Sequence, residues 1–175
     1  MVQLWIVRDP IKCVGCRLCE ISCSYYHEGR VWPEASRIKI FTLGPGVEIP
    51  HLCAQCPDYP CVEKCPTKAL YVNRRTGAVI VKQDKCISCG ACIDACPGRV
   101  PFLHPAHKKA TICDLCGGNP QCVKACNEAG WGALRLVEKV QALSYKLYSR
   151  KPEDLAKDLA QILNVRCSSN ERIYG

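Results

Sequence analysis

The sequence has no long hydrophobic run and no recognisable export signal. No apolar stretch approaches the roughly 20 residues that a membrane-spanning helix needs. The apolar segment after Met1 is too short for a signal-peptide core because it ends at Arg8, and the only adjacent arginines, Arg74 and Arg75, lie in mid-chain. We therefore expect a soluble, cytoplasmic protein that does not span a membrane.

The sequence also lacks the residue patterns of common active sites. No Ser-His-Asp arrangement, phosphate-binding glycine loop or pair of carboxylates stands out. The Gly-Pro-Gly segment at 44–46 does not have the strand-to-helix context of a nucleotide site. We therefore expect a non-catalytic protein with no substrate of its own.

Cysteine is what the sequence has in excess, with 17 among 175 residues. Sixteen of them form four groups, and each group opens with Cys-x-x-Cys and closes with Cys-x-x-x-Cys. The third group repeats the spacing of the first, whereas the second and fourth insert two and three extra residues before their third cysteine. The groups are Cys13, Cys16, Cys19 and Cys23; Cys53, Cys56, Cys61 and Cys65; Cys86, Cys89, Cys92 and Cys96; and Cys113, Cys116, Cys122 and Cys126.

This spacing is typical of the thiolate ligands of cubane 4Fe-4S clusters. A disulfide scaffold does not need one metal-ligand spacing repeated four times, and the odd cysteine count also argues against complete pairing. Zinc is an alternative, because four cysteines can also bind a zinc ion. Zinc ribbons, however, use two separated pairs rather than three close cysteines and a fourth before proline. We expect four 4Fe-4S clusters, bound by all sixteen grouped cysteines.

The formal net charge of +8 suggests a nucleic-acid partner, because basic proteins bind nucleic acid nonspecifically. Sixteen ligating thiolates would add 16 negative charges, and oxidised cluster cores return two positive charges each, so four clusters contribute about −8. The loaded protein would then be close to neutral. We therefore expect no nucleic-acid binding, which a salt-dependent shift with a generic duplex would test.

Two pairs of candidate strands indicate how the four groups combine. Residues 69–73 and 78–82 are β-rich runs joined by a turn with a glycine, so they predict a hairpin that links the second and third groups into one module. Residues 3–7 precede the first group and residues 132–137 follow the fourth, and their pairing would close the outer groups into a second module. Each unit is too small to bury an adequate core, so cluster binding must help to drive folding.

The predicted fold is therefore α+β, with two nested ferredoxin-like modules and a helical tail. Residues 37–43 and 47–52 flank the Gly-Pro-Gly turn and predict a further hairpin. The expected boundaries are 1–23 with 107–137 for the outer module, 24–52 for the hairpin insertion, 53–106 for the inner module and 138–175 for the tail.

The module pairing also predicts which cysteines share a cluster. In bacterial ferredoxins the first three cysteines of a group surround one cluster, and the fourth, on the helix that follows, ligates the other cluster of the pair. The outer groups depart from this pattern, because Ser24 and Asn127 follow the fourth cysteine where the inner groups have Pro66 and Pro97. Proline fixes the exit of the chain, so the outer groups can exit differently. The predicted sets are Cys53, Cys56, Cys61 with Cys96; Cys86, Cys89, Cys92 with Cys65; Cys13, Cys16, Cys19 with Cys126; and Cys113, Cys116, Cys122 with Cys23.

The stretch 13–136 resembles the four-cluster electron-transfer subunits of molybdenum and tungsten oxidoreductases, the group that includes the iron-sulfur subunits of DMSO reductase and formate dehydrogenase. The matching segments are HLCAQC at 51–56, PCV at 60–62, CPTKAL at 65–70, DKCISCG at 84–90 and CP at 96–97. The short fourth group, CDLCGGNPQC at 113–122, together with CVGCRLCE at 13–20, is similar to small subunits that accompany tungsten aldehyde:ferredoxin oxidoreductase-type enzymes.

This resemblance implies a hetero-oligomer that relays single electrons. The catalytic partner would hold a tungsten- or molybdenum-pterin site, and the other partner would be a ferredoxin or a flavin- or NAD-linked protein. The alternatives are a free-standing soluble polyferredoxin, or the electron-transfer subunit of a hydrogenase, formate dehydrogenase or carbon monoxide dehydrogenase.

The imidazole and aromatic side chains carry weaker signals. His27, His51, His104 and His107 could tune or ligate a cluster, but cysteines already fill all the expected ligand positions, so packing or capping is their expected role. The larger aromatic residues are expected to shield clusters from water, which shifts reduction potentials through the local dielectric, or to fill the core. They are Trp5, Trp32, Trp131, Tyr25, Tyr26 and Tyr59.

The tail predicts one amphipathic helix. Pro152 is a favourable first helical residue, and Glu153 and Asp154 follow where the helix dipole favours acids. The apolar face either packs on the ferredoxin-like modules or docks on a partner subunit. Cys167 lies outside every group and is expected to be a free thiol. The apolar residues at helical spacing are Leu155, Leu159, Ile162 and Leu163.

Overall fold

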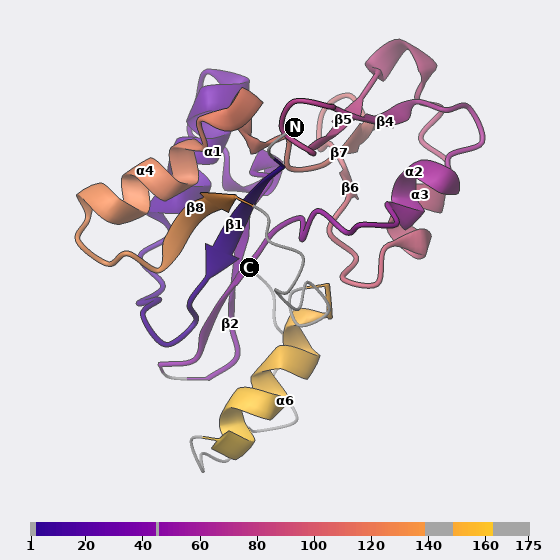
Figure 1. The fold of residues 1–175 in the computed structure, drawn as a ribbon. Helices are drawn as coiled ribbons and strands as arrows, with labels where there is room; N and C mark the ends of the chain where they lie inside the picture. Colours follow the sequence, from indigo (N-terminus) through magenta and orange to yellow (C-terminus); the bar gives the residue numbers. More distant parts are fainter. Residues whose placement is uncertain (1–2, 45, 139–148, 163–175) are drawn as a thin grey trace.

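The computed structural model describes residues 3–44, 46–138 and 149–162 (Figure 1). This part of the chain is α+β and consists of short helices and two-stranded antiparallel sheets. No helix within the described ranges is long and apolar enough to cross a membrane. Short 3-10 turns lie at Pro33–Ala35, Gln83–Lys85 and Leu115–Gly118.

Strands from distant parts of the chain form the first sheet. Strand β1 (Leu4–Arg8) pairs antiparallel with β8 (Leu134–Glu138) along its full length. Trp5 and Ile6 on β1 and Leu134 on β8 are almost fully buried. The predicted pairing of residues 3–7 with 132–137 is confirmed, and Figure 1 shows the two strands side by side near the middle of the molecule.

Three local hairpins form the other sheets of the described residues. The two predicted hairpins are confirmed, as β2 (Lys39–Thr42) with β3 (Glu48–His51) and as β4 (Leu70–Val72) with β5 (Val79–Val81). The third hairpin was not predicted. It pairs β6 (Phe102–Leu103) with β7 (Ala110–Thr111), the segments that connect the third cysteine group to the fourth.

The helices of the inner groups are short. Helix α2 (Pro60–Glu63) ends two residues before Cys65, and α3 (Ala91–Ala95) ends immediately before Cys96. The expectation that the fourth cysteine lies on the helix is therefore wrong for the inner groups. A proline follows each of these cysteines and disfavours the α conformation in the residue before it, so the helix has ended by that point.

The helices of the outer groups continue past their fourth cysteine. Helix α1 (Leu18–Glu28) includes Cys23, and α4 (Gln121–Glu128) includes Cys126. No proline follows either cysteine, so nothing interrupts the helical hydrogen bonds. The two helices pack against each other, and α4 also packs against β8 (Figure 1). The different exit predicted for the outer groups is therefore a longer helix.

Helix α6 (Pro152–Ile162) confirms the helix predicted in the tail and packs on the β2–β3 hairpin. Leu155 is buried against Val47 and Ile49. The apolar face of α6 is therefore covered, in its described part, by the chain's own hairpin. Partly buried residues around this contact are Phe41, Leu43 and Leu159. Leu163 and Cys167 lie outside the described residues.

Candidate iron-sulfur centres

The structure gathers the inner cysteines into two pockets, each lined by three cysteines of one group and the fourth of the other. One pocket, whose four cysteines are called set II, has an otherwise largely apolar lining that includes Tyr59, Val79 and Ile112. The second pocket, whose cysteines are called set III, is lined by Leu70, Leu103 and the segment 87–91. Set II contains Cys53, Cys56, Cys61 and Cys96, and set III contains Cys65, Cys86, Cys89 and Cys92.

The outer cysteines gather in the same crossed manner. A third pocket has Ile40, Trp131 and Leu134 of β8 in its wall. Its cysteines, called set I, are Cys13, Cys16, Cys19 and Cys126. The remaining cysteines form set IV, which contains Cys23, Cys113, Cys116 and Cys122. Burial raises the pKa of the last three thiols, and the charge of nearby Cys23 raises each pKa further, which places Cys23 beside them.

The four cysteine loops share one backbone feature. The residue before the second cysteine has a positive φ in every group, and only the first group has a glycine there. A left-handed residue reverses the loop locally, so the flanking cysteines turn toward one centre. Non-glycine residues in this conformation cost about 1 kcal/mol each, and they persist where the surroundings fix them. These residues are Gly15 (68°), Gln55 (49°), Ser88 (60°) and Leu115 (58°).

Backbone N-H groups donate hydrogen bonds to cysteine sulfurs of sets II, III and IV. The donors lie at 3.2 to 3.4 Å from the sulfurs. N-H donors directed at thiolate sulfur stabilise negative charge on a bound cluster and are a lever on its potential. The bonds are Arg37 N to Cys23, Gln55 N to Cys53, Ala69 N to Cys65, Val100 N to Cys96 and Ala110 N to Cys86.

Burial makes bare thiolates unfavourable in these pockets. It raises the pKa of Cys61 to about 12, and the pKa values of Cys92 and Cys116 to about 11. Burial alone would also raise the pKa of Cys65, but hydrogen bonds from the segment 67–70 lower it. Sulfurs of this kind become anionic when a metal replaces the proton, so four soft donors in a dry pocket fit an iron-sulfur cluster. Burial likewise raises the pKa of Cys13, Cys19, Cys53, Cys113 and Cys122.

The four sets form a row in the order III, II, IV, I. Neighbouring sets are close enough for the charge of one thiol to raise the pKa of another, in addition to the effect of burial. The pairs are Cys92 with Cys61, Cys53 with Cys113, and Cys19 with Cys122. Among the described cysteines, Cys89 in set III and Cys16 in set I are exposed, so an exposed cysteine lies at each end of the row.

Three of the histidines have the packing roles predicted for them. The Nε2 atom of buried His51 lies 2.8 Å from the carbonyl oxygen of Gly98, and burial lowers the pKa of His51 to about 4. His104 is 2% exposed, and its Nε2 atom lies 3.2 Å from Glu28 Oε2. His107 is exposed and stacks on the ring of His104.

The fourth histidine, His27, lies beside a candidate ligand, whereas the sequence favoured a packing or capping role for it. It stands four residues after Cys23 in α1, so both side chains lie on one face of the helix. This i, i+4 spacing was the available signal. Burial and the charge of Arg37 lower the pKa of His27.

The expected shielding by aromatic residues is correct for only part of the set. Tyr59 lines the pocket of set II, and Trp131 lines the pocket of set I although it is 45% exposed. Tyr25 and Tyr26 are 62% and 53% exposed, so the expectation that they shield clusters is wrong in this chain. Both lie on the solvent-facing side of α1, whereas Cys19, Glu20, Cys23 and Ser24 form its buried side.

Comparison with known proteins identifies the class. A model of the 4Fe-4S dicluster domain matches residues 47–137, and a model of a 4Fe-4S binding domain matches residues 11–26. This protein belongs to the 4Fe-4S dicluster domain family. It therefore carries multiple 4Fe-4S clusters, and the zinc alternative is set aside.

Individual relatives narrow the comparison. The chain is 53% identical to the aliphatic sulfonate oxidoreductase, polyferredoxin-like subunit of Pyrococcus furiosus, over 91% of this chain and 92% of that protein. It is 38% identical to protein NrfC of Escherichia coli over 71% of this chain and 62% of that protein, so it matches less than two thirds of the length of NrfC. It is 32% identical to the electron transport protein HydN of Escherichia coli, over 70% of this chain and 82% of that protein.

Proposed function

We propose that this chain is a non-catalytic electron-transfer subunit that relays single electrons through four 4Fe-4S clusters. The observation that carries the proposal is the row of sets III, II, IV and I, with an exposed cysteine at each end. A row of buried redox centres with two accessible ends can accept an electron on one side and deliver it on the other. When bound, the clusters supply the one-electron chemistry.

Each set would hold one cluster through its four thiolates, as the ferredoxin pattern predicts. The inner groups would exchange their fourth ligands, Cys65 and Cys96, and the outer groups would exchange Cys23 and Cys126. The protein would bind each cluster, exclude water with apolar side chains, and orient backbone N-H groups toward the sulfurs.

The catalytic partner that we propose holds a tungsten- or molybdenum-pterin site, and the second partner is a ferredoxin or a flavin- or NAD-linked protein. Support comes from the resemblance of the segments 13–20 and 113–122 to tungsten-enzyme small subunits. The Pyrococcus furiosus relative is named as a subunit of an oxidoreductase. The cytoplasmic location stays a prediction.

Anaerobic purification under native conditions tests this function. We expect the chain to co-purify with a larger chain that contains tungsten or molybdenum in a fixed ratio to it. Addition of that chain's substrate should bleach the visible absorption of the iron-sulfur subunit, and removal of the larger chain should abolish the bleaching.

The alternative function is a free-standing polyferredoxin, which shares the cluster content but needs no permanent partner. Size-exclusion chromatography separates the two. A loaded chain that elutes as a monomer from native extracts, with no molybdenum or tungsten in its fractions, would favour the polyferredoxin.

A further inference from the structure

Set IV has a polar surrounding made of side chains from three segments of the chain. His27 lies in the last turn of α1, one turn after Cys23. Arg37 follows α1 in the chain, and its backbone N-H donates to Cys23 Sγ at 3.3 Å. Asp114 stands next to the first cysteine of the fourth group. Three charged or polar side chains from separate segments therefore meet at one candidate cluster.

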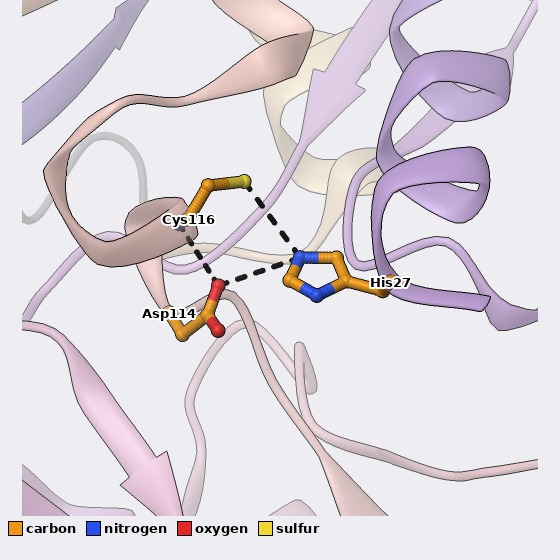
Figure 2. Close-up of side chains that lie close together, drawn as sticks. All are labelled: His27, Asp114 and Cys116. Atoms are coloured by element: carbon orange, nitrogen blue, oxygen red, sulfur yellow. Dashed lines mark hydrogen bonds and ion pairs between the residues drawn. The ribbon is translucent and has the colours of Figure 1, made fainter. Parts of the chain in front are cut away.

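These side chains are connected to each other and to a ligand sulfur. His27 Nε2 lies 3.7 Å from Cys116 Sγ and 3.5 Å from Asp114 Oδ1 (Figure 2). Asp114 Oδ1 also accepts a hydrogen bond from the backbone N-H of Cys116 at 2.9 Å. The other carboxylate oxygen, Oδ2, lies 2.6 Å from Arg37 Nη1. The side chain of His27 is 9% exposed, so water does not compete strongly for these contacts.

The neighbours of His27 Nε2 decide where its hydrogen lies. In the loaded protein a ligating cysteine is a thiolate, which only accepts hydrogen bonds, and an ionised carboxylate also only accepts. Both atoms that face Nε2 are then acceptors, so Nε2 carries the hydrogen. Arg37 neutralises Asp114 on its far side, which leaves the N-H of His27 directed at the sulfur and carboxylate pair.

We propose that His27, held in place by Asp114 and Arg37, donates from Nε2 to the Cys116 sulfur and raises the reduction potential of the set IV cluster. The proposal rests on the proposed function through the assignment of Cys116 as a ligand. Reduction adds negative charge to the cluster, and an N-H donor at a ligand sulfur stabilises that charge. His27 is a positioning residue that acts through the thiolate and is not a ligand itself.

The test is a redox titration of the anaerobically loaded full chain, followed by electron paramagnetic resonance. His27→Leu should lower the potential of one of the four steps by about 59 mV, which is a tenfold change in a one-electron equilibrium. His27→Gln keeps an N-H at similar reach, so the potential of this step should stay close to that of the unchanged protein. Asp114→Asn keeps the acceptor for the Cys116 N-H but removes a negative charge, so it should shift the same step upward.

A variant of a proposed ligand shows which cluster gives the shifted redox step. Cys116→Ser should alter the spectrum of one cluster, and the step moved by His27→Leu must belong to that cluster. His107→Leu, the same change at an exposed histidine, should move no step. If His27→Leu loads incompletely, His27→Gln and Asp114→Asn carry the test, because both keep local hydrogen-bonding groups.

The experiment distinguishes a wrong ligand assignment for set IV from a wrong role for His27. If Cys116→Ser leaves every cluster signal unchanged, the ligand assignment of set IV fails, and the proposed function needs revision. If Cys116→Ser alters a cluster but His27→Leu and Asp114→Asn leave its potential unchanged, or shift it in the same direction, the role of His27 is overturned while the relay stands.

Discussion

The inner and outer cysteine groups share the opening Cys-x-x-Cys and the closing Cys-x-x-x-Cys but differ in the residue after the fourth cysteine. In the inner groups that residue is proline, and α2 and α3 are four and five residues long. In the outer groups it is not proline, and α1 and α4 extend to eleven and eight residues. The extended α1 is what carries His27 and Glu28 to their contacts with Cys116 and His104.

This difference shows how copies of one repeated cysteine motif come to have different surroundings. In the proposed relay the cysteines determine where a cluster can bind, whereas the residue after the fourth cysteine determines how far the helix continues. A longer helix brings additional side chains to a neighbouring set, and a proline stop does not. The long α1 therefore brings His27 to set IV, a contact that the short inner helices α2 and α3 have no residues to make.

The largest expected effect comes from breaking the exchange of fourth ligands. Cys96→Ser in the inner pair should perturb the cluster of Cys53, Cys56 and Cys61, and Cys126→Ser in the outer pair should perturb that of set I. Each cysteine lines the pocket of the other group. Electron paramagnetic resonance of the reduced variants and iron analysis measure this. Self-contained motifs would give the opposite result for Cys96→Ser, with only the cluster of Cys86, Cys89 and Cys92 altered.

A proline placed in an outer helix should convert it toward the inner type. Asn127→Pro in α4 removes a backbone donor and clashes with the preceding turn, so we expect the free energy of unfolding to fall by about 3 kcal/mol. Asn127→Ala, which keeps the helix, should change it little. Denaturant titrations followed by visible absorption would measure both variants, and equal stability of the two would contradict the helix-exit explanation.

A smaller effect is expected where α6 packs on the β2–β3 hairpin. Leu155→Ala removes a side chain buried against Val47 and Ile49 and should lower the free energy of unfolding by about 2 kcal/mol. Lys157→Ala, an exposed change on the same helix, should have almost no effect. If Leu155→Ala left the stability of the isolated chain unchanged but weakened a complex with a partner, α6 would be a docking helix instead.

The smallest expected effect is at the seventeenth cysteine. Cys167 lies outside all four groups, so Cys167→Ser should leave iron content and all cluster spectra unchanged. Iron loss in this variant would mean that one of the sixteen grouped cysteines is not a ligand.

Sequence predicted most of what depends on local spacing. The cysteine groups, the β4–β5 and β2–β3 hairpins and helix α6 follow from short-range patterns. The pairing of β1 with β8 followed from their positions relative to the outer groups. The structure also gathers the four cysteine sets that the ferredoxin pattern predicts, although their role as ligands stays a prediction.

What the sequence did not predict depends on tertiary contacts or very short elements. Strands β6 and β7 have two residues each, too few to show an alternating pattern. The contact of His27 with Cys116 joins residues 89 positions apart. The exposure of Tyr25 was not predicted either, because tertiary packing decides which face of α1 the rest of the protein covers.

The measurement that tests the central claim most directly is the iron and acid-labile sulfide content of the anaerobically purified chain. Four complete sets predict about sixteen iron and about sixteen sulfide per chain, because each set of four thiolates holds one cubane. The preparation should also show broad visible absorption that dithionite bleaches. Zinc without sulfide, or about eight iron, would contradict a relay of four clusters.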